Sequence, residues 1–137
     1  MKLYHGTDNP NFELKPTKKG LGYHPGAGPV EFLGPSFSDS EEVASSYGKI
    51  IIQKEFTPTN PKKFRSLESL KRDIFKSFGL PTSGVNLGEY YRDVADSYKV
   101  KLLAEGYDSI IFQEGLKRST NEKVSTTVIP LSEDFYI

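Results

Sequence analysis

Apolar side chains recur at helical spacing in the second half of the chain. The first set is Leu67, Leu70, Ile74, Phe75 and Phe78, and Gly79 follows it. A second set runs from Leu87 to Glu105 and ends at Gly106. Apolar positions three and four residues apart line one face of a helix, and glycine is common just beyond a helix end. The pattern therefore predicts helices over residues 66–78 and 87–105.

Shorter apolar runs predict the strands. The β-branched run Ile50–Ile52 indicates a buried strand that continues to Phe56. An opening strand is expected at Lys2–Tyr4, and two final strands at 109–113 and 123–129. Ser38 and Glu41 stand at capping-box spacing, which predicts a short helix that ends near Tyr47 and Gly48. Helices inserted between strands of a small split β-sheet predict an α+β domain.

One segment, residues 8–35, breaks both periodicities because it holds ten Pro and Gly residues. Irregular segments of this length are uncommon in compact domains unless they are functional or disordered. Two interpretations therefore stay open: a loop over a ligand cleft, and a disordered segment.

Length and composition narrow the class of protein. A chain of 137 residues corresponds to a single domain, residues 1–137, and 36% hydrophobic residues exclude wholesale disorder. The absence of Cys excludes disulfides, thiolate metal sites and thiol nucleophiles. The first residues do not resemble a signal peptide, and no apolar run approaches the roughly 18 residues of a membrane helix. We expect a cytoplasmic protein without a membrane partner.

Charge and motif content remove further classes. Eighteen basic residues balance eighteen acidic ones, so a nucleic-acid partner is not expected, although a local basic patch stays possible. His5 and His24 lack a metal-ligating neighbour at i+2 or i+4, so no metal is expected. No P-loop and no dinucleotide-binding glycine motif after a strand is present.

The remaining candidates are polar or aromatic residues at the ends of predicted elements. His5 could hydrogen-bond a ribose hydroxyl while Gly6 lets a planar ligand approach the backbone; the alternative is a turn in which Thr7 and Asp8 bond locally. Tyr47 suits either stacking on a heterocycle or core packing. Glu114, after an apolar strand, is either a functional carboxylate or a solvated one. Tyr90, Tyr91 and Tyr98 suit either an acceptor-binding surface or the core.

Three segments, in order, resemble motifs of the ADP-ribosyltransferase family in its His-Tyr-Glu branch, which includes poly(ADP-ribose) polymerases and diphtheria toxin. Leu3–Thr7 resembles the aromatic-His-Gly-Ser/Thr motif at a strand end. Residues 34–39 with 44–47 resemble the Gly-x-aromatic-Phe-Ser/Ala strand and the following helix that ends in Tyr. Residues 106–111 resemble a Gly-Tyr-Asp-Gly-Ile segment of small bacterial and phage members.

The resemblance implies an ADP-ribosyltransferase-like fold and NAD as the substrate. His5 would bind the adenosine ribose, the Gly6 backbone the nicotinamide carboxamide, and Tyr47 would stack on the nicotinamide ring. Thr7, Ser36, Phe37 and Ser38 complete the matched binding motifs. Ser36 replaces an aromatic residue of the family pattern. Nicotinamide would therefore be held from one side, or with the help of Phe37.

The catalytic acid is where this chain departs from many relatives. They carry a Glu at the start of the last strand, whereas residues 124–129 contain no acid. One small phage member that acts by ADP-ribosylation has a similar ending and keeps its acid a few residues past a Gly-Tyr pair, the position of Glu114. The resemblance thus assigns catalysis to Glu114 with His5 and Tyr47, and Glu122 is the alternative acid. The Arg-Ser-Glu branch needs a Glu-x-Glu, and only Glu133-Asp134 remains.

The expected function is therefore mono-ADP-ribosylation of a macromolecular acceptor, a host protein, by a toxin or an anti-defence phage effector acting in the host cytosol. Two alternatives stay open. A catalytically inactive member of the family would bind and inhibit a host protein. A relative that modifies nucleic acid is less consistent with the zero net charge.

Overall fold

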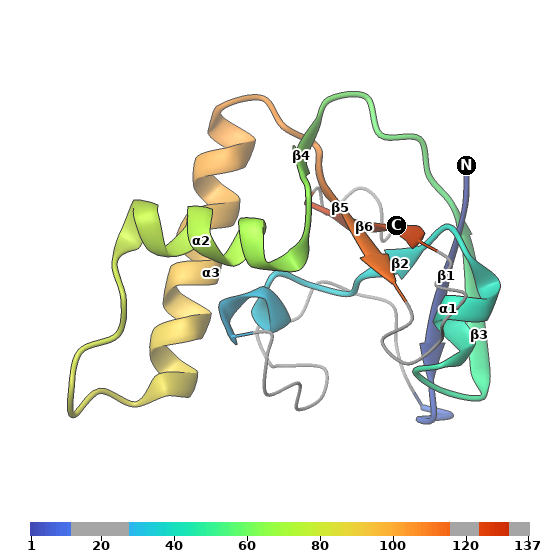
Figure 1. Cartoon of the computed structure of the whole chain (residues 1–137), viewed down its shortest axis with the longest axis horizontal. Helices are drawn as coiled ribbons and strands as arrows, with labels where there is room; N and C mark the ends of the chain where they lie inside the picture. The colour runs from blue at the N-terminus through green and yellow to red at the C-terminus, as the bar shows by residue number, and fades with distance from the viewer. Residues whose placement is uncertain (12–27, 116–123, 132–137) are drawn as a thin grey trace.

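The computed structural model describes residues 1–11, 28–115 and 124–131 (Figure 1). The described residues form one mixed sheet and three α-helices, which confirms the α+β prediction. The strands are β1 (Lys2–Thr7), β2 (Phe37–Ser38), β3 (Ile50–Glu55), β4 (Pro61–Phe64), β5 (Ser109–Gly115) and β6 (Val124–Pro130). The helices are the 3-10 helix η1 (Gly28–Phe32), α1 (Glu41–Ser45), α2 (Leu67–Phe78) and α3 (Leu87–Ala104).

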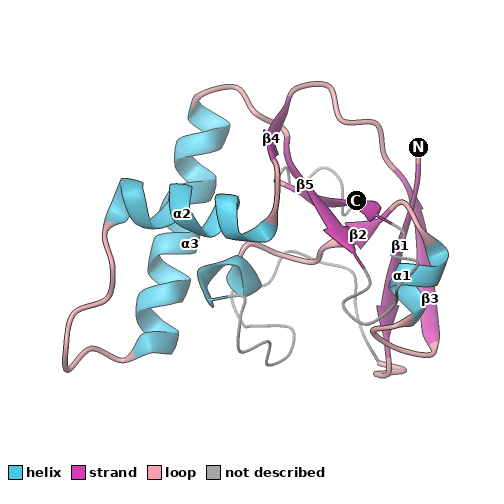
Figure 2. Cartoon of the chain, viewed as in Figure 1, coloured by secondary structure: helices cyan, strands magenta, loops and turns pink. Residues whose placement is uncertain are grey.

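The strand order is β3-β1-β2-β6-β5-β4, and only the β4–β5 pair is parallel. Strand β2 is two residues long and joins the two longer halves of the sheet. Its Ser38 lies opposite Tyr4 of β1 and opposite Thr127 of β6. The halves therefore meet at a narrow junction: β3 and β1 with α1 lie at one end of the molecule, and α2 and α3 at the other (Figure 2).

The helical half follows the sequence pattern closely. Ser66 caps α2 by accepting a hydrogen bond from Ser69 N (3.2 Å), and Asn86 caps α3 by accepting one from Glu89 N (3.0 Å). The φ of +92° at Gly106 ends α3, as glycine permits. Both predicted helices are confirmed to within one residue. They bury the larger core, which is Val30, Leu33, Leu70, Ile74, Val94, Ala95, Tyr98, Leu102, Ile110, Phe112, Ile129 and Leu131.

The other half has a smaller core of Leu3, Phe37 and Val128, with Phe56 and Ile111 packed against it. The prediction that Ile50–Ile52 is a buried strand is wrong in its burial. The strand forms, but β3 is the edge of the sheet, and Ile50 is 39% exposed. β-Branched residues favour the extended backbone whether or not the strand has neighbours on both sides.

The short helix begins later than predicted. Phe37 and Ser38 pair with Val128 and Thr127 as strand β2, so they are not available to start a helix. Ser40 is the N-cap and accepts a hydrogen bond from Val43 N (3.3 Å), while the Ser38 hydroxyl accepts one from Ser40 N (3.0 Å). The capping box at Ser38 and Glu41 is therefore wrong, and the helix ends at Ser45, two residues before Tyr47.

Two elements were not expected from the sequence. Strand β4 contains Pro61 and two lysines. These residues are common on edge strands, but they do not form the apolar pattern by which a strand is predicted from sequence. Helix η1 falls at the end of the irregular segment 8–35, and its Val30 and the following Leu33 are buried in the larger core. That end of the segment is therefore packed. Residues 12–27 lie outside the described residues, so the interpretation of a loop over a cleft stays a prediction.

Candidate functional site

The end of β1 and the end of α1 are held in direct contact. A Cβ added at Gly6 would lie 1.9 Å from the carbonyl oxygen of Ala44, and one added at Gly48 would lie 2.2 Å from the carbonyl carbon of Thr7. Only glycine fits at both positions. The sequence suggested that Gly6 lets a ligand approach the backbone. In the structure, the group that approaches the Gly6 backbone is the last turn of α1.

His5 is anchored through its ring. Its Nδ1 lies 2.7 Å from the carbonyl oxygen of Ser36, which only accepts hydrogen bonds, so Nδ1 carries the hydrogen in this contact. The ring is tilted against Phe37 at 5.6 Å between centroids. Burial lowers the pKa of His5, and the hydrogen bond to Ser36 opposes that shift without cancelling it. The neutral ring with hydrogen on Nδ1 has Nε2 as its acceptor, which is the form that binds a hydroxyl donor.

Tyr47 follows α1 and keeps 45% of its surface exposed. Its backbone N–H donates to Ala44 O at 3.1 Å, so the tyrosine continues the turn that Gly6 touches. Next to it, Asp8 accepts a hydrogen bond from Lys49 N (2.9 Å), which ties the end of β1 to the start of β3. Thr7 accepts one from Asn9 N (3.1 Å), as the turn interpretation predicted. His5, Gly6, Thr7 and Tyr47 thus form one contiguous region.

The residues of the second motif divide between surface and core. Ser36 is exposed, whereas Phe37 is 1% exposed and packs with Leu3 and Val128. Phe37 presents no surface on which a ring could stack, so the expectation that it holds nicotinamide is not supported by this arrangement. Ser38 is 6% exposed and supports the start of α1. Of the aromatic candidates here, Tyr47 presents an exposed surface.

Glu114 lies on β5, three strands away from β1 in the sheet order. Its backbone lies opposite Ser125 of β6. Phe37 of β2 lies opposite Val128 of β6, and Val128 lies opposite Ile111 of β5, so Ile111 is the residue of β5 in the row of Phe37. Glu114 is therefore three residues further along β5 than that row. The alternative acid, Glu122, lies outside the described residues, as does His24.

The third matched segment, residues 106–111, has a structural role. Burial alone would raise the pKa of Asp108, but hydrogen bonds from Thr59, Ser109 and Asn60 outweigh it and hold that pKa below its ordinary value. The Asp108 carboxylate accepts from Thr59 N (2.7 Å), Thr59 Oγ1 (2.8 Å) and Asn60 N (3.1 Å). These bonds fix the start of β4 beside the start of β5.

Sequence reasoning missed Asp39 and the buried hydroxyls of β6, which lie next to the candidate residue Ser38. Asp39 accepts a hydrogen bond from Thr126 N (2.9 Å) and donates its own N–H to Thr126 O (3.1 Å), which extends the β2–β6 contact. Ser38, Ser125 and Thr127 are all at most 6% exposed. Their run of small polar residues was visible, but only the strand pairing brings Ser38 opposite Thr127.

The tyrosines of α3 belong mainly to the core. Tyr98 is fully buried and donates a hydrogen bond to Asp73 Oδ2 (2.6 Å), while Tyr90 donates to the carbonyl of Gly79. Core packing, the alternative to an acceptor surface, is therefore correct for Tyr98.

Over the described ranges, no group of three or more His, Asp or Glu side chains is arranged to hold a metal ion. In the same part of the chain, no helix combines the length and apolar character needed to cross a membrane. Comparison with protein-family models, with curated proteins and with solved structures gives no match to this chain.

Proposed function

We propose that this protein is a mono-ADP-ribosyltransferase that binds NAD at the joined ends of β1 and α1. The observation that carries the proposal is the close packing of Gly6 on Ala44 and of Gly48 on Thr7. This packing brings two motif segments, more than 35 residues apart in sequence, to one place. It brings the turn that leads to Tyr47 against the residue that follows His5, and these are two of the residues that the resemblance assigns to NAD.

The side chains suit the parts of NAD that the resemblance assigns to them. A neutral His5 with its acceptor at Nε2 matches a ribose hydroxyl donor. The half-exposed ring of Tyr47 provides a face for the flat nicotinamide ring. In this proposal NAD is held through one polar and one aromatic contact, without a second aromatic ring on the other face of nicotinamide.

In the proposed reaction, the bond between nicotinamide nitrogen and ribose C1′ breaks, and nicotinamide leaves with the bonding electron pair. A nucleophilic atom of the acceptor then bonds to C1′ and loses its proton. Positive charge grows on the ribose ring in the transition state, and a carboxylate stabilises that charge, as in glycoside hydrolysis. We assign this carboxylate to Glu114, with Glu122 as the alternative.

The register bears on this assignment. Strands lie about 4.8 Å apart and residues about 3.3 Å apart along a strand, so three steps across the sheet and the offset of three residues separate the backbones of His5 and Glu114 by about 17 Å. In the proposal His5 binds the adenosine ribose and the acid acts on the nicotinamide ribose. The two residues therefore need not touch each other, because an extended dinucleotide holds its two riboses apart.

The test is incubation of the purified protein with NAD and a bacterial lysate, with free nicotinamide and ADP-ribose adducts followed by mass spectrometry. Glu114→Gln is compared with the wild type, and Glu89→Gln, an exposed position in the first turn of α3, is the matched control. We expect nicotinamide release that is lost in Glu114→Gln and retained in Glu89→Gln. Release that persists in Glu114→Gln and is lost in Glu122→Gln would move the acid. No release and no NAD binding by calorimetry would reject the proposal in favour of an inactive binding protein.

A further inference from the structure

The charge of this neutral chain is unevenly distributed. Residues 62–76 contain six basic and two acidic side chains, a net charge of +4, so the remaining residues carry −4. The segment spans the edge strand β4 and most of α2, at the opposite end of the sheet from β3. A concentration of this size in a chain of zero net charge marks one surface for an anionic partner.

Both acidic residues of the segment are already engaged. Glu68 pairs with Lys71 at 3.5 Å, and Asp73 accepts the hydroxyl hydrogen of buried Tyr98 at 2.6 Å. Within the described part of the chain, Arg65, Arg72 and Lys76 make no ion pair, and all three are exposed. We call Arg65, Arg72 and Lys76 the basic surface.

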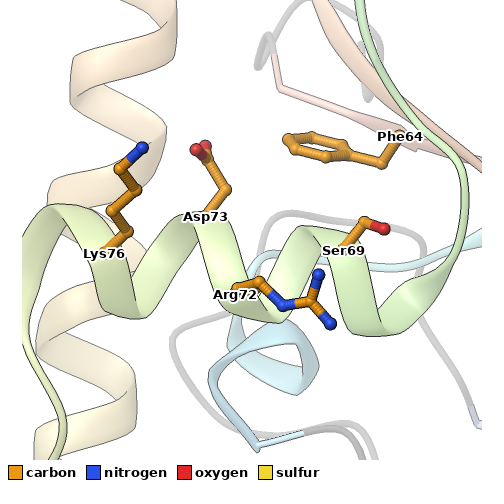
Figure 3. Close-up of a pocket in the computed structure, with 5 residues that line it drawn as sticks. All are labelled: Phe64, Ser69, Arg72, Asp73 and Lys76. Carbon is orange, nitrogen blue, oxygen red and sulfur yellow. The ribbon is translucent and has the colours of Figure 1, made fainter.

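A small hollow lies within this surface (Figure 3). It has a volume of about 240 Å³ and is lined by Phe64, Ser69, Arg72, Asp73 and Lys76. Figure 3 shows Lys76 and Asp73 pointing to the same side of α2, with the Phe64 ring beyond Asp73. Arg72 and Lys76 are four residues apart and share a helix face.

The size and chemistry of the hollow select the kind of partner. Small-molecule sites typically enclose about 300–1,000 Å³, so this open hollow suits a side chain of a partner better than a free ligand. Asp73 lines it together with Arg72 and Lys76, so one carboxylate interrupts the cations. A phosphate backbone carries a charge about every 3.4 Å along each strand and would meet that carboxylate, whereas a protein segment can leave an uncharged residue opposite it. A protein segment can instead place its acidic side chains on the arginines and Lys76 and an apolar one beside Phe64.

We propose that the basic surface docks an acidic segment of a partner protein. The docking of an acidic segment does not depend on the proposed function. The identification of that partner as the acceptor of ADP-ribose does rest on it. The surface lies on the helical half, away from the β1–α1 region, so it would hold the partner without occupying the NAD site.

The experiment measures binding of labelled poly-glutamate to the full chain by fluorescence anisotropy, without NAD, and uses single-stranded poly-uridylate as the competing probe. The variant Arg72→Glu/Lys76→Glu is compared with Lys2→Glu/Lys101→Glu, which alters two exposed lysines elsewhere and has the same net charge. Since charge pairs across an interface set both encounter rate and affinity, we expect about a tenfold loss in the first variant and less than about twofold in the second. Circular dichroism checks folding, and Arg72→Gln/Lys76→Gln replaces the first variant if it is unfolded.

Equal losses in the two variants would overturn the proposal, because net charge alone would explain the binding. Tighter binding of poly-uridylate, or no binding of either probe, would overturn it as well. Nicotinamide release is measured on the same proteins. Release that is normal in Arg72→Glu/Lys76→Glu while transfer to lysate proteins falls supports the acceptor role, whereas poly-glutamate binding without any release would support docking and reject the proposed function.

Discussion

The two halves of the sheet differ in how they are held together. Among the described residues, the core of the half with α2 and α3 contains twelve buried residues, whereas the core of the half with β3 and β1 contains three, with Val43 and Ala44 of α1 also buried. The half with the smaller core contains His5, the exposed Tyr47 and the two close glycine contacts. We therefore expect the helical half to supply most of the free energy of folding, whereas close backbone contacts and polar hydrogen bonds hold the β1–α1 half together.

The largest expected effect comes from opening a cavity in the larger core. Ile74 is fully buried on α2, so Ile74→Ala should lower the free energy of unfolding by about 2–5 kcal/mol. Ile52, half-buried on the edge strand β3, is the matched control, and Ile52→Ala should cost less than about 2 kcal/mol. Urea denaturation measures both. Equal losses would show that the two halves contribute equally.

The next effect tests the glycine contact in the smaller half. Gly6→Ala places a methyl group where the Ala44 carbonyl oxygen now lies, so α1 must move away from β1, at a cost of about 1–3 kcal/mol. We also expect weaker NAD binding, because Tyr47 moves with α1. Gly88→Ala is the control: its nearest neighbour would be 3.4 Å away, and its effect should stay within about 1 kcal/mol. Calorimetry with NAD and urea denaturation give the two readouts. An unchanged Gly6→Ala protein would contradict the packing.

A smaller effect is expected from the buried hydroxyl of Tyr98. Tyr98→Phe removes its hydrogen bond to Asp73, which should cost about 1–2 kcal/mol, since bonds to charged groups exceed neutral ones. Burial raises the pKa of Tyr98, and the hydrogen bond to Asp73 adds to the shift, so the loss should be the same at pH 6 and pH 9. Thermal unfolding at both pH values checks this. A loss that appears only at the lower pH would contradict the assigned protonation.

The smallest effect is a pH dependence centred on His5. Its pKa in the folded chain lies below the ordinary histidine value of 6.5, so the unfolded chain takes up the proton first. Its contribution to stability is therefore fully present above pH 6.5 and is lost as the pH falls toward the folded-state pKa. His5→Gln should flatten the urea midpoint against pH in this window. The pKa of Asp108 is also lowered, so this group changes the stability only in the more acidic range below the ordinary aspartate value of 3.8. An unaltered profile in His5→Gln would show that another group titrates there.

Sequence reasoning succeeded where the structure is local. The spacing in α2 and α3, their polar caps Ser66 and Asn86 and their terminal glycines all lie within single segments, so the helices were predictable. The α+β class followed from the alternation of such helices with apolar runs. The local hydrogen bond at Thr7 was anticipated as well. The rest of the turn interpretation was wrong, because His5–Thr7 is the end of strand β1 and Asp8 bonds the distant Lys49.

The errors arose where distant segments decide the outcome. Ser38, Asp39 and Ser40 are all residues that cap helices, and pairing of β2 with β6 determines that Ser40 does so. The exposure of Ile50 depends on β3 being the last strand, which no local pattern encodes. Phe37 was a candidate ligand contact, but its strand position directs it into the core beside Leu3. The contact between Gly6 and α1 also joins distant segments and has no local signal. The approach of a ligand to the Gly6 backbone stays a prediction.

Hydrogen exchange of the full chain with and without NAD, followed peptide by peptide in a mass spectrometer, tests the central claim that NAD binds at the β1–α1 half. If NAD binds there, amide exchange becomes slower at Lys2–Thr7 and at the turn from α1 to Tyr47, and it stays unchanged in α2 and α3. Slowing confined to α2 and α3, or no change at saturating NAD, would contradict it.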